Sequence, residues 1–171
     1  TTEDFHKMAG VAVSTEEYLD MSVWNHVKNR LPWLFFLMLA LMVTGFIITK
    51  FENILSQVIV LVAYLPLLMG TGGNSGAQSS TLLIRSIAVG EVVLKDASFL
   101  VGLLLSILNF AKIFFLDGEG SLIALTVCSS MLIVIMIAKI IGGLLPMAAK
   151  RIGIDPALMA SPMITSLTDM I

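Results

Sequence analysis

The sequence is poor in charged residues and in side chains that bind soft metals. Charged residues make up 13% of its 171 residues, whereas about a quarter is usual for a soluble domain. The single cysteine, Cys128, cannot form an intrachain disulfide, and with only two histidines a Cys/His metal site is not expected. The net charge of −2 comes without a basic patch, so no nucleic-acid partner is expected. Residues 1–30 are polar and amphipathic and do not resemble a cleavable signal peptide.

Long apolar runs dominate the chain instead. Hydrophobic residues account for 57% of it, and the mean hydropathy is +0.97. A helix needs about 20 apolar residues to cross the ~30 Å bilayer core. Five stretches meet or approach that length: 31–49, 54–88, 98–116, 121–147 and 155–171. Their hydrophobicity is continuous rather than alternating, which argues against a β-barrel. We therefore predict an all-α membrane protein with five spans in residues 30–171.

The second apolar run contains a polar, glycine-rich stretch, Met69–Ser80, with the sequence MGTGGNSGAQSS. Backbone at membrane depth that is not helical must be buried in protein or line a watery cavity. The run is about 52 Å long if fully helical, which is too long for one straight crossing. We therefore predict that Pro66 and the glycines kink or break this helix. The alternative to a ligand role for the polar residues of this stretch is that small residues such as Gly73 let helices pack closely.

Asp169 is the strongest candidate for chemistry, because it lies about 14 residues, or ~21 Å, into the fifth run. An ionisable group inside a bilayer is costly and marks a functional hypothesis. Ser161, Thr165 and Asp169 are spaced i, i+4 and i+8, so they share one helix face. Such a face is typical of the wall of an aqueous cation path. The alternative is that Asp169 lies near the outer interface or bonds to a neighbouring helix.

Asn74 and Gln78 are also four residues apart and offer amide oxygens on one face of the second span. Hard cations prefer oxygen ligands, and Mg²⁺ gives up its waters reluctantly. Amides, hydroxyls and one carboxylate therefore suit a largely hydrated Mg²⁺. One carboxylate per chain is too few for a divalent site. We therefore expect a homodimer with two-fold symmetry, which is the commonest symmetry of oligomers. The fifth and second spans would then face the axis, with Gly73 in the pore wall.

Two further acidic residues are weaker candidates. Asp155 and Pro156 are expected to begin the fifth helix as its N-cap and first residue. Asp155 is also placed for a second cation contact at the cytoplasmic pore mouth. Glu52 would lie at the outer mouth, where it either attracts cations or is simply a solvated surface residue.

The distribution of basic residues predicts the orientation. With the N-terminus inside, Lys50 is outside and seven basic residues are cytoplasmic: Lys7, Lys28, Arg30, Arg85, Lys95, Lys150 and Arg151. We therefore expect a multi-pass protein of the cytoplasmic membrane with its C-terminus outside. Residues 1–29 form the cytoplasmic juxtamembrane region, in which 15–30 are predicted to form a helix along the lipid surface.

Two long motifs indicate a family. The first is PLLMGTGGNSGAQSSTLLIR at 66–85, and the second is LLPMAAKRIGIDPALMASPMITSLTDM at 144–170. With these motifs the chain closely resembles, over nearly its whole length, the transmembrane domain of the MgtE-type magnesium channel family.

The resemblance implies a Mg²⁺-selective channel, dimeric, with five spans per subunit and the pore between subunits. Asp169 matches the family's pore aspartate that binds hydrated Mg²⁺, with Thr165 and Ser161 on the same wall. The family's own cytosolic N-terminal and CBS domains sense Mg²⁺ and close the gate through a plug helix. Those domains are not in this sequence, and residues 1–29 resemble the plug region.

Other functions are weighed against this channel. A carrier coupled to Na⁺ or H⁺ also uses broken helices and remains the main alternative. An enzyme would need a nucleophile with a base or a metal–histidine group, and neither His6 nor His26 falls in a predicted span. A structural scaffold would leave the cost of a buried Asp169 unexplained.

Overall fold

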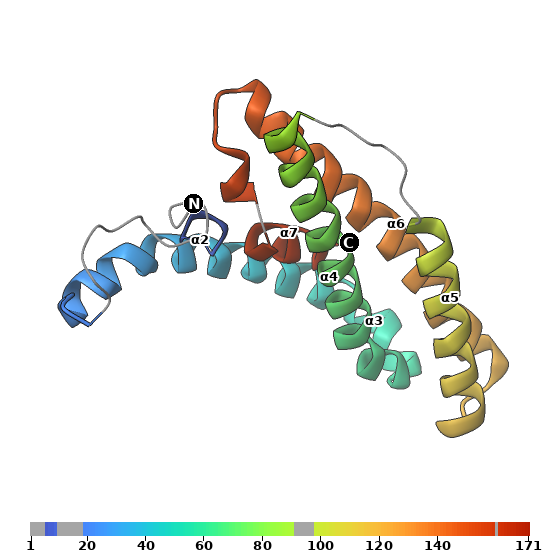
Figure 1. The fold of residues 1–171 in the computed structure, drawn as a ribbon. Coiled ribbons are helices and arrows are strands. Elements are labelled where there is room, and N and C mark those ends of the chain that lie inside the picture. The colour runs from blue at the N-terminus through green and yellow to red at the C-terminus, as the bar shows by residue number, and fades with distance from the viewer. Residues whose placement is uncertain (1–5, 10–18, 91–97, 160) are drawn as a thin grey trace.

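The chain is mostly helical in the part that its computed structural model describes, which is residues 6–9, 19–90, 98–159 and 161–171 (Figure 1). The elements in chain order are α2 (Val23–Lys50), α3 (Glu52–Leu55), the 3₁₀ turn η1 (Ser56–Val58), α4 (Val60–Val89), α5 (Ser98–Ala111), the π-helical turn η2 (Lys112–Leu116), α6 (Ser121–Arg151), the 3₁₀ turn η3 (Pro156–Met159) and α7 (Ser161–Thr168). No strand occurs within these ranges, so the predicted all-α class is confirmed.

Two of the helices, α2 and α6, are long and apolar enough to cross a membrane. A third candidate span combines Glu52–Val58 with α4 across a bend of 113°. The apolar helix Leu100–Leu116 is shorter. The described residues thus hold two spans by length and composition, or three if the bent pair counts as one. The number of five spans stays a prediction.

The predicted single helix over 155–171 is wrong in the described residues. The structure has the 3₁₀ turn η3, then the eight-residue helix α7, and a turn at the end. Pro162, the second residue of α7, favours the interruption, because proline cannot donate the hydrogen bond that would continue a helix from the preceding turn and its ring clashes with the carbonyl four residues earlier. At about 12 Å, α7 is too short to cross ~30 Å of hydrocarbon by itself.

Helix α2 begins earlier than predicted. The Ser22 hydroxyl accepts a hydrogen bond from the Asn25 amide (3.3 Å) and caps the helix there. From Val23 the helix runs without a break to Lys50, so Pro32 lies inside it and not in its first turn. Separate helices over 15–30 and 31–49 are therefore wrong from residue 23 onwards, and residues 10–18 lie outside the described part.

The glycine-rich stretch does not break its helix, so the predicted break is wrong, while a kink stays a prediction. Helix α4 is continuous through Pro66 and Met69–Ser80. The sharp bend lies earlier, between Val58 and Val60. Gly72, Gly73 and Gly76 are buried instead, which agrees with the alternative interpretation that small residues let helices pack closely.

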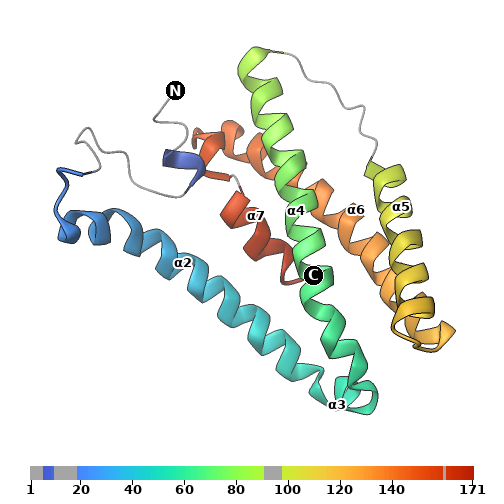
Figure 2. The ribbon, with the colours of Figure 1, turned by 60° about the horizontal axis from the view of Figure 1, so that its bottom comes forward.

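The close packing joins α4 to α6 and α7. A Cβ placed on Gly76 would lie 2.9 Å from the Ala138 carbonyl oxygen and 2.7 Å from Ile164 Cγ2. A Cβ on Gly142 would collide with the Gly76 carbonyl oxygen, and one on Gly72 would lie 2.5 Å from Val134 Cγ1. The residue numbers of these contacts increase together along both helices, so α4 and α6 run parallel. Helix α5 packs on α6, while α2 diverges from the bundle and contacts α7 (Figure 2).

A polar contact ties α4 to the turn between η2 and α6. The Tyr64 hydroxyl donates to Asp117 Oδ2 (2.8 Å), and Lys112 Nζ lies 2.6 Å from the same oxygen. Tyr64 also packs in a core cluster with Ile113 and Cys128. Cys128 is thus a buried packing residue, as its position in an apolar run indicates.

The contact of Gly142 with Gly76 predicts that Gly142→Ala destabilises the protein by about 1–3 kcal/mol, because the added methyl group forces the helices apart. Thermal unfolding in detergent, followed by circular dichroism, measures the effect. Gly143→Ala is the matched control, since a Cβ at Gly143 meets nothing within 4 Å. Equal melting temperatures for the two variants would contradict the close approach.

The contacts of Asp117 predict a pH-dependent stability. Its hydrogen bonds from Lys112 and then Tyr64 hold the pKa of Asp117 below its ordinary value. The stabilisation is therefore complete above the unfolded pKa of about 3.9 and is lost as the pH falls through the lower, folded pKa. The difference in melting temperature between wild type and Asp117→Asn should be constant above about pH 5 and shrink in stronger acid. A difference that grows towards acid pH would refute this.

Candidate cation site

Asp169 is the first residue beyond α7. Its amide donates to the Thr165 carbonyl oxygen (3.0 Å), which is the i to i−4 bond of another α-helical turn. The backbone therefore keeps Asp169 in helical register with Thr165, as the spacing predicts. The side chain is half-buried. No residue of the described ranges forms a hydrogen bond or an ion pair with its carboxylate.

Asp169 lines a cavity of about 290 Å³ between the end of α2, the start of α4 and the middle of α6. Four of the lining residues are polar: Thr44, Ser130, Thr168 and Asp169 itself. The Thr44 hydroxyl oxygen is buried and has no hydrogen-bond partner in the described residues. Val134, another lining residue, lies about 20 Å along α6 from its first residue. The Asp169 carboxylate is thus at mid-height of this helix.

Thr165 lies directly on the glycine face of α4. A Cβ on Gly73 would lie 2.9 Å from Thr165 Cγ2 and 3.3 Å from its hydroxyl oxygen. The predicted site residues Gly73 and Thr165 are therefore in contact, and the missing side chain at Gly73 makes room for the threonine. Ser161 is the first residue of α7; the position of its side chain lies outside what the structure describes.

Asn74 and Gln78 lie apart from Asp169 in the single chain. Both are exposed, and with Thr81 they line an open hollow of about 560 Å³ on the outside of α4. This hollow shares no lining residue with the cavity at Asp169. The chain by itself thus presents two amides on an outer helix face, where lipid would leave their polar groups unsatisfied.

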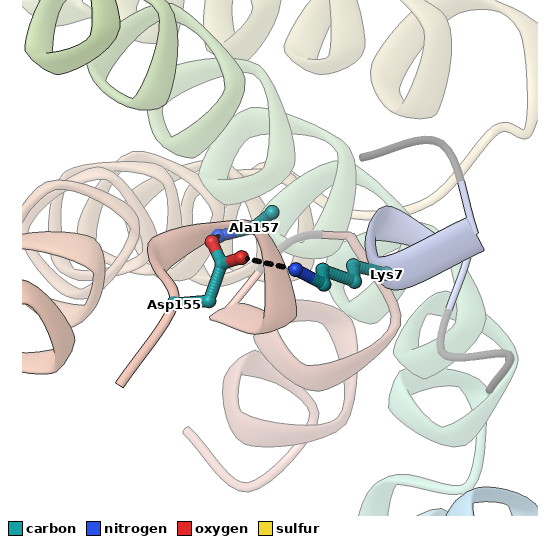
Figure 3. A network of polar contacts seen from close by, with 3 residues as sticks. All are labelled: Lys7, Asp155 and Ala157. Atoms are coloured by element: carbon teal, nitrogen blue, oxygen red, sulfur yellow. Dashed lines mark hydrogen bonds and ion pairs between the residues drawn. The ribbon is translucent and has the colours of Figure 1, made fainter. Parts of the chain in front are cut away.

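Asp155 has a partner for each carboxylate oxygen. Its Oδ1 accepts from the Ala157 amide (3.0 Å), a cap of the 3₁₀ turn rather than of the predicted α-helix. Its Oδ2 accepts from Lys7 Nζ at 2.8 Å (Figure 3). No sequence signal indicates this pair, because the two residues are 148 positions apart. Glu52, the other weaker candidate, is exposed at the start of α3.

The described residues contain no group of three or more His, Cys, Asp or Glu side chains that could hold a metal ion. Sequence reasoning missed Thr44, Ser130 and Thr168 beside Asp169. The only available signal was a small hydroxyl residue inside an apolar run, which by itself indicates nothing more than packing. What the cavity offers a cation is one carboxylate and three hydroxyl-bearing residues in its lining, of which Thr168 already donates its hydroxyl to the Thr165 carbonyl oxygen (2.9 Å).

Comparison with known proteins fixes the family. The model of the MgtE family, described as a divalent cation transporter, matches residues 65–171, more than half of the chain. The chain belongs to the MgtE family. The resemblance drawn from its two motifs is thereby confirmed.

Three relatives carry the name magnesium transporter MgtE. The protein from Thermus thermophilus is 36% identical over 99% of this chain, and that from Enterococcus faecalis is 30% identical over 98%. The protein from Bacillus subtilis is 29% identical over 99%. This chain spans only 39% of the Thermus and Bacillus proteins and 38% of the Enterococcus protein. Their names describe transporters and not enzymes.

The ion pair of Lys7 with Asp155 predicts a measurable coupling. Both side chains are partly exposed, at 25% and 37%, so the pair should contribute about 0.5–1 kcal/mol. A double-mutant cycle with Lys7→Ala and Asp155→Ala, read by thermal unfolding at low salt, measures that term. Lys50→Ala in place of Lys7→Ala is the control and should give additive effects with Asp155→Ala. Additivity in the Lys7 cycle as well would mean that the contact contributes nothing.

Proposed function

We propose that this chain forms the membrane pathway of a Mg²⁺-selective channel in which hydrated Mg²⁺ is recognised by Asp169. The observation that carries the proposal is the Asp169 carboxylate at mid-height of α6, with no partner in the described residues. An unpaired carboxylate away from bulk water is costly. A passing cation would offset that cost, and the names of the relatives support Mg²⁺ as this cation.

The chemistry of the lining favours a hydrated ion. Thr44, Ser130 and Thr168 line the cavity together with Asp169, and hydroxyl groups such as theirs can bond to the water shell that Mg²⁺ keeps. Thr165 and Ser161 precede Asp169 on the same helix face and would continue this polar wall. Mg²⁺ here is the transported ion, bound only in passing.

A homodimer would complete the site. Two copies related by a two-fold axis supply two Asp169 carboxylates. The exposed face of Asn74 and Gln78 supports this arrangement, because at an axis these amides would face the pore and not lipid. Gly73 behind them keeps α7 close to α4. Glu52, exposed at the start of α3, would attract cations at the outer mouth.

Asp155 would make a second cation contact only by releasing Lys7. Both of its carboxylate oxygens are engaged, one by the Lys7 ammonium group. A divalent ion carries twice that charge and so competes with Lys7 for the carboxylate. In the proposed orientation this exchange takes place at the cytoplasmic side, where the cytosolic and CBS domains expected in the full-length protein would act.

A carrier coupled to Na⁺ or H⁺ is the second candidate, supported by the helix interruption between η3 and α7 just before Asp169. Interrupted helices commonly form the ion sites of carriers. The two functions differ in their driving force. Channel flux follows voltage and the Mg²⁺ gradient alone, whereas carrier flux also requires the gradient of the coupled ion.

The proposal predicts that Asp169→Asn lowers Mg²⁺ uptake at least roughly tenfold, the equivalent of losing about 1.4 kcal/mol of ion interaction. Uptake into liposomes containing the purified protein, under a set voltage and without Na⁺ or pH gradients, measures it. Glu119→Gln, at a carboxylate in the turn before α6, is the charge-matched control and should transport like wild type. Unchanged uptake in Asp169→Asn would move the ion path elsewhere.

A further inference from the structure

A second cavity, of about 440 Å³, lies at the end of the bundle where α4 and α6 both terminate. It shares no lining residue with the Asp169 cavity. Its apolar lining, called here the apolar wall, includes Ile84, Ile87 and Pro156. The lining also carries positive charge, from Arg85 in the last turns of α4 and Lys150 at the end of α6.

The charge in this cavity is positive and not balanced within the described part of the chain. Arg85 and Lys150 are exposed, and neither has an ion pair or hydrogen bond in those ranges. The acidic lining residue, Asp155, is already neutralised by Lys7 (Figure 3). Its carboxylate therefore does not cancel the field of the two basic side chains, and the cavity favours an anion.

The apolar wall decides which kind of anion fits. A small, fully hydrated anion gains nothing from Ile84 and Ile87, whereas a phospholipid has acyl chains to place there. Its phosphate can take the planar guanidinium of Arg85 in a bidentate contact, with Lys150 as a second charge. Basic pockets between helix ends at a membrane surface are suited to such headgroups. Phospholipids also surround a membrane protein, so this ligand would be present at high local concentration.

We propose that this cavity binds the headgroup of an anionic phospholipid, with the phosphate held by Arg85 and Lys150 and an acyl chain along Ile84 and Ile87. The bound lipid bridges the ends of α4 and α6 beside Asp155. It thus supports the segment from which η3 and α7 start. The site uses none of the residues that line the Asp169 cavity, although Asp155, the proposed second cation contact, is among its own lining residues.

Lipid binding is tested directly by native mass spectrometry of the purified protein with phosphatidylglycerol and phosphatidylcholine in equal amounts. Wild type should retain phosphatidylglycerol in preference to phosphatidylcholine. The variant Arg85→Gln/Lys150→Gln should weaken that retention at least roughly tenfold, the equivalent of 1.4 kcal/mol. The matched control, Lys28→Gln/Arg151→Gln, removes two charges outside the cavity and should bind like wild type. An equal loss of phosphatidylglycerol retention in both variants would mean that the lipid is held only by general electrostatic attraction, and would overturn the site.

Two further experiments use the wild-type protein, so their results do not depend on whether a variant folds. A photoreactive phosphatidylglycerol with its reactive group on the acyl chain should label peptides containing Ile84 and Ile87. Labelling confined to other peptides would refute the assignment. Excess inorganic phosphate should leave phosphatidylglycerol bound, since it cannot use the apolar wall. Complete displacement by phosphate would identify a site for a free anion instead of a lipid.

Discussion

The close approach of α4 to α6 and α7 is the constraint on which the rest of the structure depends. Helices in lipid gain little from the hydrophobic effect when they meet, so they must approach closely to gain dispersion energy. Gly76 and Gly142 permit this at backbone distance. Because Gly73 lacks a side chain, Thr165 can rest on α4, and α7 is held where Asp169 reaches the cavity at mid-height of α6. The glycines therefore position the carboxylate although they offer a cation no ligand themselves.

Three aspartates of the chain differ in whether their carboxylates have partners. Asp117 is held by Lys112 and Tyr64, and Asp155 by Lys7 and the Ala157 amide. Asp169 has no such partner in the described ranges. A carboxylate already paired with lysine must release that lysine before it takes a cation, whereas an unpaired one need not. This contrast supports the proposal that Asp169 recognises the transported ion.

The sequence was a good guide where the physical cause is local and a poor one where packing competes with local preference. Pro66 and the glycines of Met69–Ser80 favour a helix break, yet α4 runs through them. Burial against two helices outweighs the loss of about 0.5–1 kcal/mol that each interior glycine causes. The real bend, between Val58 and Val60, carries neither glycine nor proline. In residues 155–171 the continuous apolar pattern predicted one helix. It did not indicate the break before Pro162, because hydrophobicity carries no information about the missing N–H of a proline.

The sequence by itself determined the helical membrane class, the MgtE family and Asp169 as the candidate residue. Each follows from a property of the chain that needs no folding: long apolar runs, two extended motifs and a charge that lipid would not tolerate unaided. The tertiary structure alone decided that Thr165 rests on Gly73, that Lys7 pairs with Asp155, and that Arg85 and Lys150 share one cavity. Such contacts join residues far apart in the chain, so they are set by how the helices pack and not by any local preference.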